Sequence, residues 1–106
     1  MSKHVQMLLV ELELHLKQLQ LWSEVAPDPA ALASTMPFCV DTLPLHSWLQ
    51  FIFIPRMHIL LNAKAELPGS IHMLPIAEEA FKHLGEQAGG LLEVIDAIDQ
   101  AVRAGL

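Results

Sequence analysis

The sequence predicts an all-α protein, a four-helix bundle-like array in one domain that spans residues 1–106. Two observations carry this prediction. Hydrophobic residues make up 53% of the chain while aromatic residues make up 6% and Tyr is absent, so the apolar fraction is mainly Leu, Ile, Val, Met and Ala, which favour helices over strands. Apolar residues also recur at helical spacing in successive segments, and the short connections between the later ones favour antiparallel neighbours.

The first predicted helix runs from Ser2, a suitable N-cap, to about Glu24. At about 100° per residue its apolar residues form two stripes on nearly opposite faces. One stripe contains Val5, Leu8, Leu9, Leu12, Leu16 and Leu19, and the other contains Met7, Val10, Leu14 and Leu21. A helix with two apolar stripes contacts two things. We expect the first stripe to face the bundle and the second to meet either another chain or residues 25–40.

The connection that follows contains prolines and small residues, with one helical turn predicted at residues 29–33 and started by Asp28. The second predicted helix begins near Thr42 and ends near Lys64, before a turn that contains Pro and Gly. We do not expect a domain boundary in either connection.

The middle of this second helix is apolar on every side. Between residues 45 and 54 nearly every side chain is hydrophobic, which places the helix at the centre of the fold. Pro55 then removes one backbone donor and collides with the carbonyl of Phe51. We therefore predict a kink at Pro55, with the helix resuming after it.

The third predicted helix starts at Pro75 and ends at Gly85, and the last runs over residues 87–104. The last helix has an inner stripe of Leu91, Ile95, Ile98 and Val102, with Glu93, Asp96, Asp99, Gln100 and Arg103 outside. Gly89 and Gly90 would weaken its first turn by ~1 kcal/mol each relative to Ala. Either they allow a close approach between helices, or the helix starts after them.

The charge pattern gives no sign of nucleic-acid binding. The formal net charge is -6, and the six bases are spread out at Lys3, Lys17, Arg56, Lys64, Lys82 and Arg103. Because affinity for nucleic acid comes mostly from clustered cations on phosphates, direct RNA or DNA binding is not expected. The excess of hydrophobic residues in so short a chain instead predicts a homo-oligomer, with a dimer favoured, or a protein partner.

The chain reads as a cytoplasmic protein. Cys39 is the single cysteine, which fits a reducing compartment. Glu11 and Glu13 interrupt the apolar stretch where a signal peptide would be free of charge. The longest apolar run, about ten residues, is too short for a bilayer that needs ~20, so no membrane association is expected.

No catalytic residue, metal site or cofactor is predicted. The six histidines form no His-x-x-x-His pair, and no Glu-x-x-His occurs, although bundle di-metal sites require that motif. Nucleophile-elbow and Gly-rich phosphate-binding motifs are also absent from the sequence. The sequence therefore favours a non-enzymatic protein.

One binding site can be put forward from the residues around Pro55. Arg56 follows an apolar run, so its cation must reach solvent or be paired, for instance with Asp41. On a functional interpretation, the kink presents Arg56 and His58 to an anionic ligand. The candidate binding residues are Asp41, Trp48, Gln50, Arg56 and His58. On a structural interpretation, Trp48 is a core anchor and Gln50, the one amide of the run, needs a partner if buried.

Several of these residues also form a family signature. Pro37, Phe38, Asp41, Thr42, Trp48, Leu49, Gln50, Ile54, Pro55, Arg56 and Met57, followed by Leu67, Pro68 and Gly69, resemble the YqcC-like family of small bacterial proteins of unknown function. Trp22 and Pro75 fit the same pattern, so the resemblance covers nearly the whole chain. It implies an all-helical cytosolic protein.

The same resemblance bears on function. Some members of the family are encoded beside a tRNA pseudouridine synthase and have inherited that enzyme's name. Such synthases need a large mixed α/β catalytic domain and a basic groove for RNA, and this sequence has no strand pattern and no basic patch. We therefore expect a self-associating or protein-interaction module. An accessory role in tRNA modification would act through protein contacts. The alternative is a small-molecule binding protein or enzyme with a site at Pro55.

Overall fold

The computed structural model describes residues 2–36, 38, 42–65 and 71–104, which form helices and turns with no strand among them. In chain order the elements are α1 (Ser2–Gln18), α2 (Pro29–Leu32), α3 (Leu45–Trp48), the π-helical segment η2 (Leu49–Phe53), α4 (Ile54–Asn62), α5 (Leu74–Ala80), the 3-10 helical segment η3 (Lys82–Ala88) and α6 (Gly89–Arg103). The all-α prediction is confirmed. A four-helix bundle with a kink at Pro55 is not confirmed.

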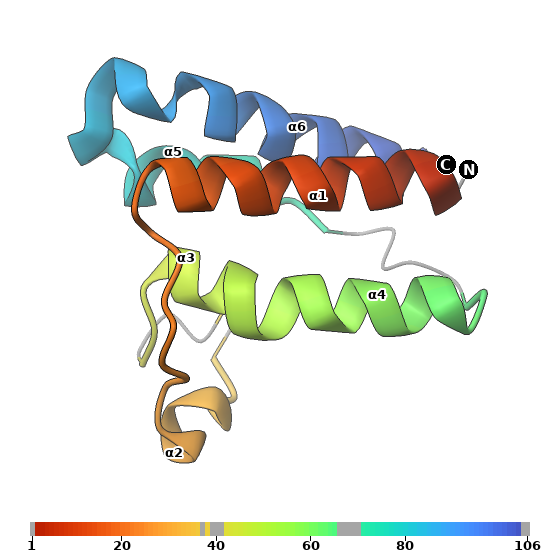
Figure 1. Ribbon diagram of the computed structural model, residues 1–106, viewed down its shortest axis with the longest axis horizontal. Helices are drawn as coiled ribbons and strands as arrows, with labels where there is room; N and C mark the ends of the chain where they lie inside the picture. The colour runs from red at the N-terminus through yellow and green to blue at the C-terminus, as the bar shows by residue number, and fades with distance from the viewer. Residues whose placement is uncertain (1, 37, 39–41, 66–70, 105–106) are drawn as a thin grey trace.

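α1 is the element against which the other long helices pack. It runs side by side with α6 in the opposite direction, and α4 lies along another side of it (Figure 1). α5 packs against α6. α3, η2 and α4 follow one another as a central helix, and the short α2 stands apart from α1, beyond α3 (Figure 1). One face of α1 is therefore enclosed by other helices.

The enclosed face of α1 is the predicted inner stripe. Its buried side chains are Val5, Leu8, Leu9, Leu12 and Leu16, and the matching stripe of α6 buries Leu91, Ile95, Ile98 and Val102. Burial of these side chains removes apolar surface from water, which is the main driving force of the fold. The inner stripes of the first and last helices are confirmed, with Leu19 of the first stripe only partly buried.

α1 ends at Gln18, well before the predicted end near Glu24. Gln20 adopts a left-handed backbone conformation with φ 61°, its N–H donates to Lys17 O at 3.1 Å, and Leu21 N–H donates to Leu16 O at 2.8 Å. This pair of bonds is a Schellman motif, which ends a helix by satisfying its last carbonyl groups. The sequence carries no signal for it, because the left-handed position usually holds Gly and here holds Gln.

The central helix starts later than predicted. Its first residue is Leu45 instead of a residue near Thr42, because Pro44 is the N-cap and has an extended backbone with ψ 154°. The Thr42 hydroxyl donates to Ala31 O at 2.7 Å and so joins the residues before the central helix to α2. The predicted helical turn started by Asp28 is present as α2.

A π-helical segment lies immediately before Pro55. In η2 the turns are wider than α-helical turns, and Ile54 N–H donates to Leu49 O, five residues earlier. Proline has no N–H to donate to the preceding turn, and its ring collides with the carbonyl group four residues earlier in a regular α-helix. The wider π-helical turn accommodates the ring and the missing hydrogen bond. The central helix thus continues from η2 into α4, which contains Pro55 as its second residue and ends at Asn62.

The last third of the chain is more segmented than predicted. The third helix ends at Ala80 and is followed by η3, in which Gly85 has a positive φ of 58°. A glycine adopts this conformation without steric cost, and so the chain turns here between α5 and α6. Gly85 separates the last two predicted helices, but the α-helix preceding it is shorter than expected.

Gly90 lies where α6 meets the side chain of His15 on α1. A Cβ atom built on Gly90 would lie 2.6 Å from Cε1 of His15, whereas one built on Gly89 would meet nothing within 4 Å. Both glycines are in α6, which starts at Gly89. Of the two predicted explanations for these glycines, close helix approach therefore holds for Gly90.

We expect the two adjacent glycines to respond oppositely to alanine. Gly89→Ala should raise the free energy of unfolding by about 0.5–1 kcal/mol, because Ala reduces the entropy of the unfolded chain. Gly90→Ala should lower it by about 1–2 kcal/mol through overpacking against His15. Urea denaturation measures both changes, and adding His15→Ala should remove most of the Gly90→Ala penalty. Equal stabilisation by both alanines would contradict the close contact.

Asp99 corrects the predicted outer face of α6. The prediction placed Asp99 outside with Glu93 and Asp96, but its exposed fraction is 0%. Its carboxylate accepts hydrogen bonds from Met73 N–H at 2.9 Å and from Leu74 N–H at 2.8 Å. These are backbone donors at the start of α5, so Asp99 caps one helix from another.

Candidate functional site

The predicted binding residues do not converge on one site. Asp41 lies outside the described residues. Gln50 is buried, where its side-chain oxygen accepts from Ser23 N–H at 2.8 Å and its amide nitrogen donates to Ser23 O at 2.6 Å. Both ends of this amide are thus occupied by the backbone that follows α1. The expectation that a buried Gln50 needs a partner is met by Ser23.

Arg56 and His58 are both exposed on α4, but they face different directions. Two residues apart on a helix, their side chains leave the axis about 200° apart. No hydrogen bond or ion pair joins Arg56 to any of the described residues. The described part of the chain therefore does not bring Arg56 and His58 together as a cradle for an anion.

Trp48 belongs to an aromatic cluster. Its ring centroid lies 4.8 Å from that of Phe38 in an edge-to-face arrangement and 5.5 Å from that of Phe53 in a stacked one. Phe38 holds a positive φ of 57°, which is uncommon for an aromatic residue, and its contact with Trp48 supplies energy that offsets this strain. Trp48 is half-buried, in agreement with the structural interpretation of an anchor.

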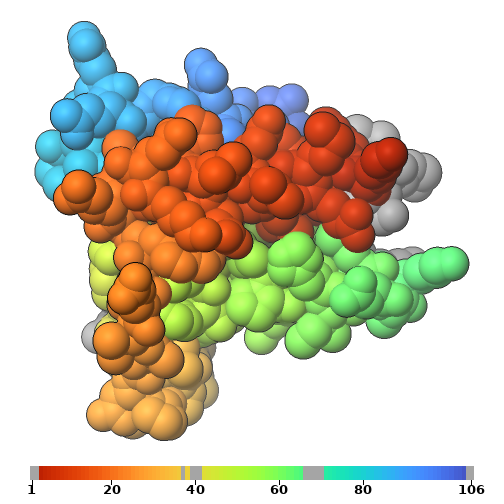
Figure 2. All heavy atoms as spheres, in the orientation of Figure 1, coloured from red at the N-terminus to blue at the C-terminus, as the bar shows by residue number. Residues whose placement is uncertain are grey.

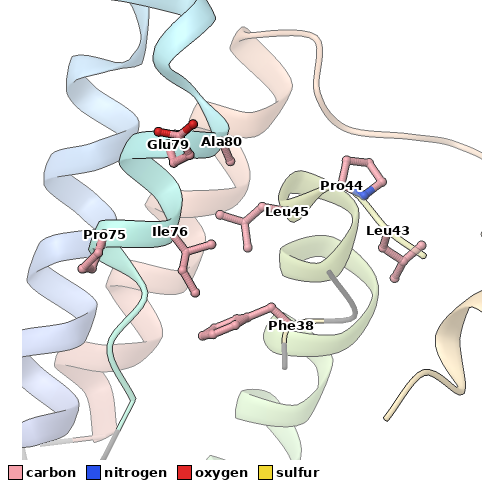
Figure 3. A pocket seen from close by; sticks show the side chains of 8 residues that line it. All are labelled: Phe38, Leu43, Pro44, Leu45, Pro75, Ile76, Glu79 and Ala80. Atoms are coloured by element: carbon pink, nitrogen blue, oxygen red, sulfur yellow. The ribbon is translucent and has the colours of Figure 1, made fainter. Parts of the chain in front are cut away.

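A cavity of about 470 Å³ lies between the start of the central helix and α5, not at Pro55. Its lining residues are Phe38, Leu43, Pro44, Leu45, Pro75, Ile76, Glu79 and Ala80. Leu45 and Ile76 point toward each other across it, with Phe38 at one end and the Glu79 carboxylate at the other (Figure 3). Sequence reasoning missed this cavity, because its apolar lining has the same pattern as ordinary core residues.

The cavity suits an apolar molecule better than an anion. Most of its lining groups are hydrocarbon, and the charged group at its edge is a carboxylate. Glu79 is exposed and pairs with Lys82 at 2.6 Å. The cavity therefore differs in chemistry as well as in place from the predicted anion site.

A histidine pair lies near this region. Partial burial lowers the pKa of His46, on α3, below its ordinary value of 6.5, and the neighbouring His83 of η3 lowers it further. His46 is half-buried whereas His83 is exposed. The folded protein therefore favours the neutral form of His46.

This histidine makes stability depend on pH. The unfolded chain binds a proton at His46 at a higher pH than the folded chain does, so its contribution to stability is complete above pH 6.5 and is lost as the pH falls below that value. In urea denaturation from about pH 7.5 to about pH 5, the fall in unfolding free energy should be smaller for His46→Gln than for wild type. His4→Gln, an exposed histidine variant on α1, is the control. An unchanged profile in His46→Gln would contradict this assignment.

Other classes of site find no support in the described residues. Among them no group of three or more His, Cys, Asp or Glu side chains is placed to hold a metal ion. Within the same residues, the helices are too short or too polar to cross a bilayer.

The second apolar stripe of α1 is a prominent surface feature. The exposed fractions of Met7, Val10 and Leu14 are 60%, 58% and 52%, so the described part of the connection, residues 25–36, does not cover them. α1 forms much of the face seen in Figure 2, while the connection after it leads away from the helix. The prediction that Leu21 belongs to this second stripe is wrong, because Leu21 follows the end of α1 and packs against the core. We call Met7, Val10 and Leu14 the outer stripe.

Comparisons with known proteins agree with this architecture. The family DUF446, described as tRNA pseudouridine synthase C, matches residues 4–101. The solution NMR structure of YqcC from Escherichia coli superposes with a TM-score of 0.86 and 33% identity, over 99% of this chain and 90% of that one. In sequence, the chain is 37% identical over 95 residues to the uncharacterized protein YqcC of Escherichia coli K12, covering 90% of this chain and 87% of the relative.

A further relative carries an enzyme's name. The tRNA pseudouridine synthase C of Pectobacterium carotovorum is 37% identical over 81 residues, which is 76% of this chain but 22% of that protein. Most of that longer protein thus lies outside the match. The family model, the sequence relatives and the solved fold agree, and the chain belongs to the YqcC-like family.

Proposed function

We propose that this protein is a cytoplasmic, non-enzymatic interaction module that acts through protein contacts made by the outer stripe of α1. The observation that carries the proposal is the exposure of Met7, Val10 and Leu14, each more than half exposed on one face of a helix. Exposed apolar side chains that neighbour one another on one surface are typical of a protein contact. The opposite face of α1 is buried in the core, so α1 would connect the core to the protein that binds the outer stripe.

The comparisons support a role beside a tRNA-modifying enzyme. In the Pectobacterium protein named tRNA pseudouridine synthase C, the segment similar to this chain forms 22% of the whole. A domain found within a longer protein works at a high effective concentration beside the rest of it. We propose that the separate chain meets a synthase of this kind through its outer stripe, and that it does not itself bind RNA.

Self-association offers a second way to cover the same stripe. A dimer through α1 would shield Met7, Val10 and Leu14 from water, as the hydrophobic excess of the sequence suggests. Both arrangements require the outer stripe to remain apolar, because a charged side chain placed in the stripe would be buried in the contact and should abolish it.

The test compares wild type with a Val10→Glu and Leu14→Glu double variant. Light scattering at micromolar concentrations should show wild type as a dimer, or as a complex when the tRNA pseudouridine synthase of the same bacterium is added, and the variant in neither form. An Asn62→Glu and Gln87→Glu variant changes the charge equally at exposed positions elsewhere and should behave as wild type. A wild type that stays monomeric with and without the enzyme, or a stripe variant that associates equally well, would refute the proposal.

A small-molecule binding protein is the second candidate, and the cavity beside Phe38 favours it. A space of about 470 Å³ with an apolar lining falls within the size range of ligand pockets. Ala80→Leu would fill part of this space from α5. If the cavity binds ligands, a neutral apolar fluorescent probe such as N-phenyl-1-naphthylamine should bind wild type and lose affinity for Ala80→Leu. Equal binding to both would exclude this site.

A further inference from the structure

The outer stripe has the spacing of a coiled-coil seam. Met7, Val10 and Leu14 alternate by three and four residues, and Lys3 and Lys17 continue the same alternation at the two ends. A repeat of this kind keeps one face of a helix against a partner helix. The seam has apolar layers in its middle and an exposed lysine at each end.

The two positions that flank this seam are acidic at its centre. Glu11 follows Val10 on one side and Glu13 precedes Leu14 on the other. Glu13 is paired with Lys17 at 2.7 Å, and the Lys17 ammonium also lies 5.2 Å from the centroid of the Trp22 ring. Glu11 is exposed and has no ion pair among the described residues. It is therefore the flanking charge available to a partner.

A second copy of the chain fits this charge pattern poorly in either direction. In a parallel pair each layer faces its own counterpart, so Lys3 meets Lys3 and Lys17 meets Lys17. In an antiparallel pair the flank with Glu11 faces the same flank of the other copy, and so does the flank with Glu13. Like charges at these positions destabilise the pair, and the net charge of -6 adds to the repulsion.

We propose that the outer stripe binds an amphipathic helix of another protein, with apolar residues at its seam, Lys or Arg on its flanks and carboxylates at its end layers. This inference rests on the proposed function and names the partner's chemistry. A basic flank pairs with Glu11 and an acidic end layer pairs with Lys3, while Glu13 and Lys17 remain paired with each other. A lipid surface lacks this match, because helices that bind anionic membranes carry bases on their polar face.

The size of the seam sets the strength of the contact. α1 has 17 residues, of which three exposed apolar side chains form the seam. An interface this small is at the low end of specific contacts, so we expect dissociation constants on the order of micromolar and a strong dependence on salt.

The test uses two synthetic helical peptides of about three heptads with the same leucine seam. One has Lys on its flanks and Glu at its end layers, and the other has these charges exchanged. In fluorescence anisotropy at low salt, wild type should bind the basic-flanked peptide about tenfold more tightly, and Glu11→Lys should reduce that preference several-fold. Glu93→Lys, exposed on α6, is the matched control and should leave it unchanged.

Each outcome separates this inference from the proposed function. Equal affinity for the two peptides, or a preference that survives Glu11→Lys, would overturn the charge-matched helix. If light scattering then shows a dimer abolished by Val10→Glu and Leu14→Glu, a second copy covers the stripe, and the interaction function stands while this inference fails. If the stripe variant changes neither peptide binding nor association, both fail.

Discussion

Replacing Asp99 with Ala should lower the free energy of unfolding by about 3 kcal/mol. The carboxylate is fully buried and accepts hydrogen bonds from Met73 N–H and Leu74 N–H. Alanine would leave these donors without a partner inside the protein and would remove a negative charge from the start of α5. Chemical denaturation monitored by circular dichroism measures the change.

Two further variants make this prediction specific. Asp99→Asn retains one acceptor oxygen, so it should lose less stability than Asp99→Ala. Asp96→Ala is the matched control, because Asp96 lies three residues earlier and its carboxylate accepts an exposed hydrogen bond from the side-chain amide of Gln100. A loss for Asp99→Ala no larger than that for Asp96→Ala would show that the cap contributes little.

Gln50→Leu should destabilise the fold by about 2 kcal/mol. Leucine fills a similar volume but leaves both the N–H and the carbonyl of Ser23 without the amide that binds them. Because these bonds join the segment after α1 to the central helix, the variant should also raise amide hydrogen exchange around Ser23. Urea denaturation gives the first quantity and exchange measured by NMR gives the second.

The control for this variant is Gln18→Leu, an exposed amide at the end of α1, which should change the stability by less than about 0.5 kcal/mol. If Gln50→Leu were equally neutral, the paired contacts with Ser23 would be expendable. Gln50 would then be free to serve as the binding residue that the sequence suggested.

The sequence predicts the parts of this fold that follow from apolar periodicity. The inner stripe of α1 and that of α6 lie buried as their spacing indicates, because side chains three and four residues apart share one face of a helix. Helix ends were less predictable. α1 stops where Gln20 takes a left-handed conformation, and a residue type that seldom does so gives no warning of it.

Asp99 shows a second limit. Its place in the sequence among Asp96 and Arg103 gives it the appearance of a surface residue, and only the approach of α5 supplies the backbone donors that justify its burial. Polar residues whose partners come from distant parts of the chain cannot be placed from local pattern. The same holds for Gln50, whose partner Ser23 precedes it by 27 residues.

The candidate sites divide in the same way. The outer stripe could be predicted as far as Leu14, because it depends on the geometry of one helix. Leu21 does not lie on the stripe, because α1 ends before this residue. The grouping of Arg56 and His58 required a bend that would bring neighbouring side chains together. A π-helical turn before Pro55 instead carries the helix forward and leaves those two side chains on different faces.

The measurement that most directly tests the role of the outer stripe is an NMR titration of the isotope-labelled protein with the tRNA pseudouridine synthase of the same bacterium. The account predicts that amide signals change most at Met7, Val10, Glu11 and Leu14, and that Val10→Glu with Leu14→Glu abolishes the changes. Changes confined to the cavity residues around Leu45 and Ile76, or none on adding the enzyme or on raising the protein's own concentration, would contradict it.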